Sequence, residues 1–340
     1  MNIRENVLRF TCNGATLFGI LSEPVAPASP AAGSTASGDA GTAPADASIN
    51  ARAAAIDAIN ASPSASRGML IVVGGPQYRA GSHRQFALLA RDVAAAGVPV
   101  MRFDYRGMGD SEGVQRAFDT VDDDLRAAVD CFFTAVPSLR SIAIWGLCDG
   151  ACAALFYSHT DARVDGLVLL NPWIRTEAGL ARAQLKHYYL RRLVDRKFWL
   201  KIASGHFAFG PSLRSLADAV AKVVAPKARL DRNGTATEGT VDGGVDGGVD
   251  GGGATAAASL PQRMQHSFAR FKGQVLLIIS GRDLTAKEFL DTVAGSRGWK
   301  KILAAPRVTR HDLLTADHTF STRAWRNQVS AWTRAWLQSR

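Results

Sequence analysis

One stretch near the middle of the chain limits the possible folds most strongly: Ser141-Ile-Ala-Ile-Trp-Gly-Leu-Cys-Asp-Gly-Ala-Cys-Ala-Ala-Leu155. It predicts a short apolar strand, a glycine-flanked turn and then a helix of small residues. Gly-x-Cys-x-Gly between a strand and a helix is typical of a nucleophile elbow, with Cys where Ser is usual. The turn would place Cys148 at a helix N-terminus, where backbone N–H groups favour a thiolate and a developing oxyanion.

The alternative interpretation is that Cys148 is a small buried apolar residue, as free cysteines often are. Gly-x-x-x-Gly occurs by chance in a chain with 32 glycines. The motif therefore indicates catalysis only if other segments supply a base, an orienting acid and oxyanion donors.

Strand and helix patterns alternate on both sides of this stretch. Residues 6–23 predict a hairpin around an Asn-Gly turn at 13–14. Buried-type strands are expected at 69–73, 98–103, 166–170 and 273–280, and helices at 82–96, 120–136 and the C-terminus. Such alternation predicts an α/β fold with a mostly parallel central sheet covered by helices.

Two biased segments interrupt the pattern. Residues 25–67 are rich in Ala, Ser, Pro and Gly with few large apolar residues, and residues 227–260 carry Val-Asp-Gly-Gly at a period of four. We interpret them as a disordered insertion and a flexible linker. The intervening residues 173–226 read as a helical cap, which gives core segments at 1–172 and 261–340.

Positive charge is concentrated in one region. The chain carries a net charge of +10, and residues 173–232 alone hold 13 Lys and Arg against 4 Asp and Glu. Either this is a solvated face, or it is a basic surface for an anionic substrate, a carrier or a membrane surface. No nucleic-acid-binding motif accompanies the charge, so we do not expect nucleic acid as a partner.

The remaining sequence signals bear on compartment and cofactors. No apolar run of about 18 residues and no secretion signal are visible, so we expect no membrane span. Cys12, Cys131, Cys148 and Cys152 lack the spacing of a disulfide framework, which fits a reducing cytoplasm. No phosphate loop, dinucleotide fingerprint or metal cluster appears, and we expect neither cofactor nor metal.

An acid and a base for Cys148 follow in the order that an elbow fold requires. Asp283 comes just after the strand ending at Ser280, and His318 lies in the loop before the last helix. Asp283 could instead be a turn residue or the N-cap of the next helix, and His318 an ordinary loop histidine. His311 is the second choice for the base. Asn171, where some related folds keep the acid, is not a carboxylate, which favours Asp283.

Two backbone N–H groups are expected to form the oxyanion hole: that of Asp149 and one from the loop after Val73. Pro76 has no N–H, so we predict Gln77 as the second donor, with Tyr78 in reserve. Gly75 allows close approach of this loop. The candidates for the substrate pocket are Gly75, Tyr78 and Trp173.

The ordered part of the chain resembles the α/β-hydrolase superfamily. The motifs that carry the resemblance are Gly74-Gly75, Asp104-Tyr-Arg-Gly-Met-Gly-Asp-Ser111, Gly146-Leu-Cys-Asp-Gly150, Gly281-Arg-Asp283 and Asp317-His318. More narrowly, the chain resembles the exosortase A system-associated hydrolase 1 family in Val73-Gly-Gly-Pro-Gln-Tyr-Arg79, Gly81-Ser-His-Arg-Gln85, Trp145-Gly-Leu-Cys-Asp149, Leu170-Asn-Pro-Trp173 and Leu185-Lys-His-Tyr-Tyr189.

The resemblance implies an α/β-hydrolase fold and an enzyme that hydrolyses or transfers an acyl group from an ester or thioester. It also implies a link to bacterial exopolysaccharide biosynthesis and exosortase/PEP-CTERM sorting, whose proteins are candidate contacts. A Cys-His-Asp set is similar to that of dienelactone hydrolases. The expected substrate is a small or carrier-bound acyl compound. The competing hypothesis is a catalytically silent binding or scaffolding protein of the same system.

Overall fold

A computed structural model describes residues 2–25, 67–75, 77–174 and 258–339 of the chain. The predicted insertion at 25–67, the cap at 173–226 and the linker at 227–260 lie almost entirely outside these ranges. Met1–Ile174 and Met264–Arg340 belong to one compact unit, and Arg175–Arg263 to another. The account below concerns the first unit, called the core.

An eight-stranded sheet of order β1-β2-β4-β3-β5-β6-β7-β8 forms the centre of the core. β1 (Ile3–Cys12) and β2 (Ala15–Pro24) make the predicted hairpin, which pairs antiparallel with β4 (Val100–Phe103). The other strands pair in parallel: β3 (Arg67–Val72), β5 (Ser141–Leu147), β6 (Val164–Leu170), β7 (Gln274–Ser280) and β8 (Val308–Leu313). The predicted mostly parallel sheet is thereby confirmed.

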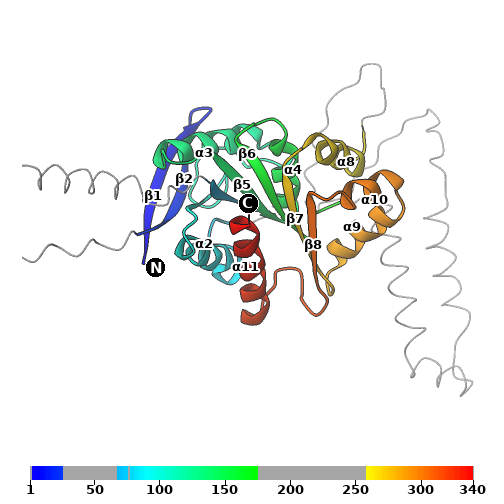
Figure 1. The fold of residues 1–340 in the computed structure, drawn as a ribbon. Coiled ribbons are helices and arrows are strands. Elements are labelled where there is room, and N and C mark those ends of the chain that lie inside the picture. The colour runs from blue at the N-terminus through cyan, green and yellow to red at the C-terminus, as the bar shows by residue number, and fades with distance from the viewer. Residues whose placement is uncertain (1, 26–66, 76, 175–257, 340) are drawn as a thin grey trace, which may run out of the picture. The chain divides into compact units, whose positions relative to one another are not determined.

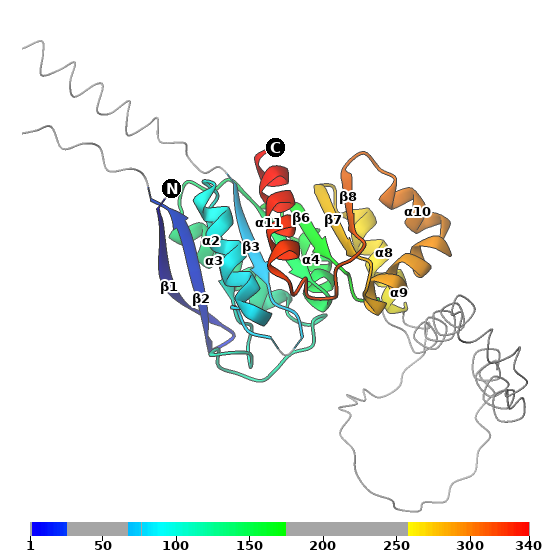
Figure 2. The ribbon, with the colours of Figure 1, turned by 90° about the horizontal axis from the view of Figure 1, so that it is seen from below.

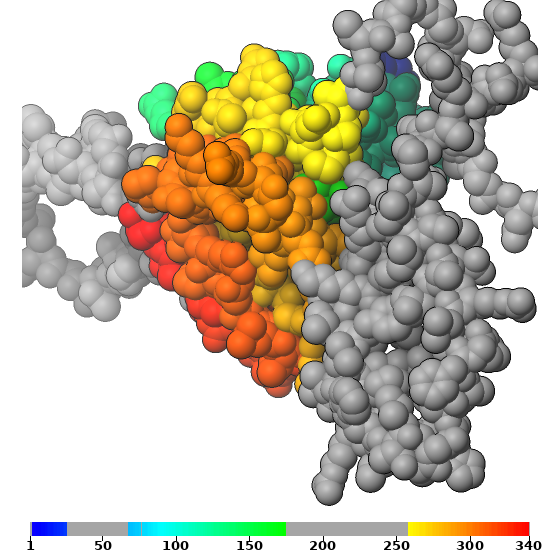
Figure 3. Space-filling model, turned by 90° about the vertical axis from the view of Figure 1, so that its right-hand side faces the viewer, coloured from blue at the N-terminus to red at the C-terminus, as the bar shows by residue number. Residues whose placement is uncertain are grey.

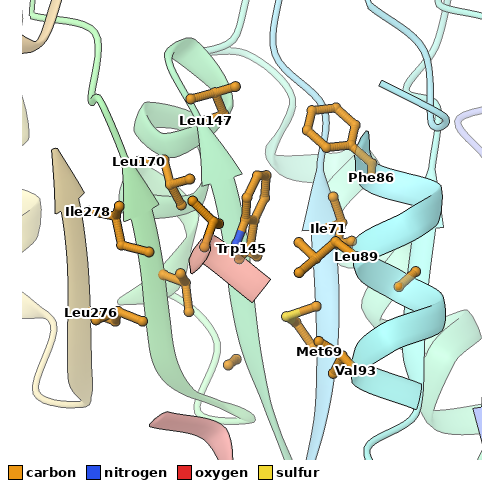
Figure 4. Close-up of a cluster of buried hydrophobic side chains, with 14 of the residues drawn as sticks. Met69, Ile71, Phe86, Leu89, Val93, Trp145, Leu147, Leu170, Leu276 and Ile278 are labelled. Carbon is orange, nitrogen blue, oxygen red and sulfur yellow. The ribbon is translucent and has the colours of Figure 1, made fainter. Parts of the chain in front are cut away.

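Helices cover both faces of the sheet. α2 (Gln85–Ala95) and α11 (Arg323–Gln338) lie side by side on one face, and α3 (Asp122–Ala135) and α4 (Asp149–Ser158) lie on the other (Figures 1 and 2). Apolar residues at helical spacing explain the contact of α2 with the sheet, since Phe86, Leu89 and Val93 are buried. These side chains meet Ile71 and Trp145 from the strands (Figure 4).

Three further helices pack beside β7 and β8: α8 (Leu260–Arg270), α9 (Leu284–Ala294) and α10 (Arg297–Leu303). Figure 3 shows α9 and α10 in orange next to α8 in yellow. Trp299 of α10 is 1% exposed, and its ring meets Phe268 of α8 and Phe289 of α9 edge to face. This aromatic contact holds the three helices together. No helix within the described ranges is long and apolar enough to cross a membrane.

The predicted start of α2 at residue 82 is wrong by three residues. His83 and Arg84 have φ angles of 52° and 59°, in the left-handed region that an α-helix cannot include. Ser82–Arg84 forms a short 3₁₀ turn, η1, and the α-helix begins at Gln85.

The loop after β4 is held by two buried carboxylates. Asp104 is fully buried and accepts hydrogen bonds from the Arg79 backbone N–H, at 2.6 Å, and from the Arg79 guanidinium. Asp124 of α3, also fully buried, accepts from Arg106 Nη2 at 2.7 Å and from the Arg106 backbone N–H at 2.8 Å. Asp104 therefore connects this loop to the loop after β3, which approaches the elbow.

Removal of the Asp124 carboxylate is expected to destabilise the core strongly. Asp124→Ala leaves the buried Arg106 guanidinium without its bidentate partner, and breaking such a pair costs about 3 to 5 kcal/mol. Asp123→Ala is the matched control, because its side chain is 66% exposed and we expect a loss below about 1 kcal/mol. Urea unfolding of the full chain measures both, and equal effects would contradict the role of Asp124.

Candidate active site

Cys148 occupies a strained turn between β5 and α4. Its φ of 62° and ψ of −123° lie in a region that side-chain-bearing residues rarely adopt. The backbone holds this conformation on both sides: Cys148 N–H donates to Leu170 O at 2.9 Å, and Cys148 O accepts from Ala151 N–H at 3.1 Å. Cys148 is half-buried. This is the backbone conformation that the elbow motif predicts.

Two glycines make the turn possible because the chain segments almost touch there. A Cβ on Gly150 would lie 2.8 Å from Val72 O, and a Cβ on Gly146 would lie 2.6 Å from the carbonyl carbon of Gly150. Contacts this short exclude any side chain at either position. The spacing of the motif thus follows from the approach of α4 to β3 and β5.

Asp283 and His318 lie together at the carboxyl edge of the sheet. His318 Nδ1 is 2.8 Å from Asp283 Oδ2. Asp283 is also the N-cap of α9, since its carboxylate accepts from Thr285 N–H at 3.0 Å and from Ala286 N–H at 3.1 Å. The two interpretations of Asp283 are therefore compatible: its cap bonds fix the carboxylate in the orientation that faces His318.

His318 also interacts with the elbow, because the Cys148 side chain helps to raise the pKa of its imidazole. Burial lowers the pKa of His318, but hydrogen bonds to Asp283 and Cys148 and their negative charges raise it more, to about 10. Asp283 and His318, predicted from separate segments, thus lie in contact.

The loop that carries His318 is held by residues that the sequence did not single out as functional. Asn171, fully buried at the end of β6 with φ of 42°, donates from Nδ2 to His318 O at 3.1 Å. Its Oδ1 accepts from Ser280 N–H at 2.9 Å. Asp317 accepts from Ser321 N–H at 3.0 Å. Asn171 therefore connects the loop that carries His318 to the ends of β6 and β7. No sequence motif predicts this role.

The loop after β3 contacts the elbow through the side chain of Asp149. Asp149 Oδ2 accepts from Gly75 N–H at 2.7 Å, and Oδ1 accepts from Gly150 N–H at 3.0 Å. Burial raises the pKa of Asp149, and these two N–H groups offset part of the rise. Gly75 N–H is thus occupied by a carboxylate, which the sequence did not predict.

The other predicted site residues lie near the same loops. Gln77 is half-buried, and its Oε1 accepts from Ser82 N–H at 3.3 Å. Tyr78 is 52% exposed. Trp173 is half-buried and donates its backbone N–H to Cys148 O at 3.2 Å. Of the pocket candidates, Gly75 and Trp173 therefore have backbone contacts with the elbow.

The alternative candidates for the base and the nucleophile lie in environments unlike those of His318 and Cys148. His311 stacks on Trp332 with ring centroids 4.5 Å apart, on the side of α11. Cys152 is fully buried; burial raises its pKa well above the usual value, and its Sγ lies 2.8 Å from Trp173 O. Burial raises the pKa of Cys131 to about 11. Neither thiol has the surroundings of a nucleophile.

Comparison with known proteins identifies the family. Residues 65–287 match the profile of the family described as Serine aminopeptidase, S33. The chain belongs to this family of α/β hydrolases. The match spans β3 to the start of α9, and so includes the elbow and Asp283. No curated protein matches the chain.

Solved structures of the same fold include several esterases. An esterase from Pyrococcus furiosus aligns with a TM-score of 0.56 at 13% identity, over 99% of this chain and 91% of that one. The esterase Est1E of Butyrivibrio proteoclasticus, solved with ferulic acid, gives 0.52 at 13% identity over 98% of each chain. A cold-adapted esterase from an Arctic intertidal metagenomic library gives 0.52 at 14% identity, over 100% of this chain and 95% of that one. At such identities the likeness establishes the fold.

Replacing Asp283 by Asn should lower the pKa of His318. Asn can still cap α9, but the negative charge beside the imidazole is lost. We expect the pKa to fall from about 10 by about 1 to 3 pH units, measured by NMR titration of the labelled histidine ring. Asp312→Asn, in β8, is the control and should leave His318 unchanged. A His318 pKa that is the same in Asp283→Asn would contradict the electrostatic coupling.

The raised pKa of His318 also makes the free energy of unfolding depend on pH. The pKa of His318 is about 10 in the folded state against 6.5 normally, so its protonated form stabilises the fold. This stabilisation is complete below about pH 6.5 and is lost as the pH rises to about 10. The difference in unfolding free energy between wild type and His318→Gln should shrink over that range. A constant difference in urea titrations between pH 6 and 10 would argue against the raised value.

Proposed function

We propose that the protein hydrolyses or transfers acyl groups from esters or thioesters with a cysteine nucleophile. In this proposal Cys148 attacks the acyl carbon, His318 moves the proton, and Asp283 orients His318. The observation that carries the proposal is the 2.8 Å contact between Asp283 Oδ2 and His318 Nδ1, together with the contribution of Cys148 to the raised pKa of His318. Family membership and the strained elbow support it.

The first half-reaction would proceed from a charged pair. The Cys148 thiol would pass its proton to His318, whose raised pKa of about 10 favours the imidazolium form. The thiolate forms a C–S bond as the carbonyl electron pair moves to oxygen. Collapse of this intermediate breaks the bond to the leaving group, which takes the proton from His318. A thioester on Cys148 and a neutral imidazole remain.

The second half-reaction would restore the enzyme. Water or an acceptor hydroxyl loses its proton to His318 and attacks the thioester carbon, and the C–S bond then breaks. The products are an acid or a new ester, together with the thiolate and imidazolium. A thioester intermediate suits either acceptor. The nucleophilic oxygen thus decides between hydrolysis and transfer.

The Asp149 and Gln77 backbone N–H groups are the proposed oxyanion donors. Gly75 N–H already donates to the Asp149 carboxylate, and Pro76 has no N–H. Gln77 is therefore the next donor along this loop. The Asp149 side chain would fix the loop relative to the elbow, and Gly75, Tyr78 and Trp173 would border the acyl group.

The substrate class and setting are proposed from the sequence. The resemblance to the exosortase A system-associated hydrolase 1 family supports a role in exopolysaccharide biosynthesis and the exosortase/PEP-CTERM system. The basic segment at 173–232 supports an anionic or carrier-bound acyl substrate. All four cysteines are free, which is consistent with action in the reducing cytoplasm. We retain the predicted organisation of a core with a basic cap and two insertions as part of this proposal.

Thiol reactivity and ester turnover test the assignment. Cys148→Ala should lower kcat/KM for p-nitrophenyl butyrate by at least about 10³-fold and abolish iodoacetamide labelling at neutral pH. Cys131→Ser is the matched control and should leave both unchanged, since burial raises that thiol's pKa to about 11. His318→Ala should slow labelling of Cys148 at pH 7 by at least about tenfold. Normal turnover in Cys148→Ala would sink the proposal.

The scaffolding alternative predicts a different pattern. A protein of this fold without catalysis would show no turnover in wild type, and Cys148 labelling would be independent of His318. Mass spectrometry of the protein purified from its native host is the most direct search for the substrate. We expect a thioester-linked acyl or glycan-derived adduct on the peptide that contains Cys148, and its loss in Cys148→Ala.

A further inference from the structure

A cavity lies between α2 and α11, outside the proposed active site. It has a volume of about 560 Å³, within the range of roughly 300 to 1,000 Å³ of small-molecule sites. None of the residues that line it is Cys148, His318 or Asp283. Its floor is formed by Trp145 and Leu170 from the sheet and by Phe320 from the loop before α11. Figure 4 shows Trp145 between Leu170 and Phe86.

Two donors from buried side chains in the cavity wall are unsatisfied. Gln85 is 8% exposed and Trp145 is 2% exposed. Among the described residues neither Gln85 Nε2 nor Trp145 Nε1 has a hydrogen-bond partner. Leaving a buried donor unpaired costs free energy, because the donor has lost its bond to water. A ligand that accepts hydrogen bonds would remove this cost.

Positive charge lines the same cavity from α11. Arg323 and Arg326 both contribute to its wall, and no carboxylate in the described part of the chain forms an ion pair with either. Arg326 donates to Ser321 O. The one acidic lining residue, Asp92, already accepts from Ser330 Oγ and lies 3.4 Å from Arg334 Nε. The cavity therefore offers donors and positive charge.

Apart from Asn327, the remaining wall is apolar. Leu89, Leu170, Phe320 and Val329 are buried along the cavity, and Leu88, which is 42% exposed, stands where it meets solvent. An anion without an apolar body would leave this surface in contact with water. A multiply charged anion would also cost more to desolvate than a single charge.

We propose that the α2–α11 cavity is a second binding site for an apolar monocarboxylate, such as a medium-chain fatty acid. The apolar body lies against Leu89, Phe320 and Val329. The carboxylate accepts hydrogen bonds from the unpaired donors and from Arg323 and Arg326 of α11, because an acceptor-only group suits these N–H groups. The site does not depend on the reaction proposed for Cys148.

Binding of decanoate to the full chain tests this site. Isothermal titration calorimetry should show one decanoate site in wild type. Arg323→Gln should weaken the affinity about tenfold, because a hydrogen bond to a charged group is lost. Gln85→Leu, which keeps the volume and removes the donor, should weaken it roughly threefold. Because Arg323 is exposed, its replacement should leave the fold intact. A change in decanoate affinity in this variant therefore reports on binding and not on unfolding.

Two controls separate this site from the active site and from nonspecific charge. The variants His318→Ala and Arg140→Gln should both bind decanoate as wild type does; Arg140 is an exposed arginine just before β5. ¹⁵N-tryptophan labelling gives a direct readout, because decanoate should shift the Trp145 indole signal, assigned by its loss in Trp145→Phe. Absence of binding, loss of binding in His318→Ala, unchanged affinity in Arg323→Gln, or equal affinity for decanol would each overturn the proposal.

Discussion

The close approach of α4 to the ends of β3 and β5 is the constraint on which the rest of the site depends. A side chain at position 146 or 150 would collide with backbone atoms. The chain can therefore make this turn only with glycine at both positions. The turn forces Cys148 into a φ of 62°, and the bonds to Leu170 and Ala151 hold it there. Backbone strain of this kind persists only where the surrounding structure fixes it. The packed centre of the sheet does so here.

The carboxylates of Asp149 and Asp283 hold the neighbouring loops against this rigid turn and the sheet edge. Asp149 binds the N–H of Gly75 and so holds the loop after β3 against the elbow. Asp283 caps α9 and faces His318 with the same carboxylate. Both side chains are fixed by backbone N–H groups before any substrate is present. Such prior ordering fixes the loop after β3 and the His318 ring in place.

The positions at strand ends were predictable because parallel strands share one carboxyl edge. This rule alone brings Cys148, Asp283 and His318 to one side of the sheet, in the order that an elbow fold uses. Contacts made by side chains across the sheet were not predictable. In the sequence, Asn171 served only to exclude an acid at the end of that strand. In the structure its side chain donates a hydrogen bond to the backbone carbonyl of His318. The bond between Gly75 and Asp149 joins residues 74 positions apart, and no local pattern records it. The short helix α10 was not predicted either. It is stabilised by the packing of Trp299 against Phe268 and Phe289, which belong to other helices.

By itself the sequence determined the alternation of strands and helices, the elbow and the candidates for acid and base. These features depend on periodicity, glycine placement and chain order, which act over a few residues or follow from topology. Tertiary structure decided which side chains touch. It made Asp283 both a helix cap and the partner of His318, raised the pKa of that histidine, and left two buried donors facing a cavity between α2 and α11. Those outcomes depend on distances, burial and charge across the fold, which a linear pattern does not contain.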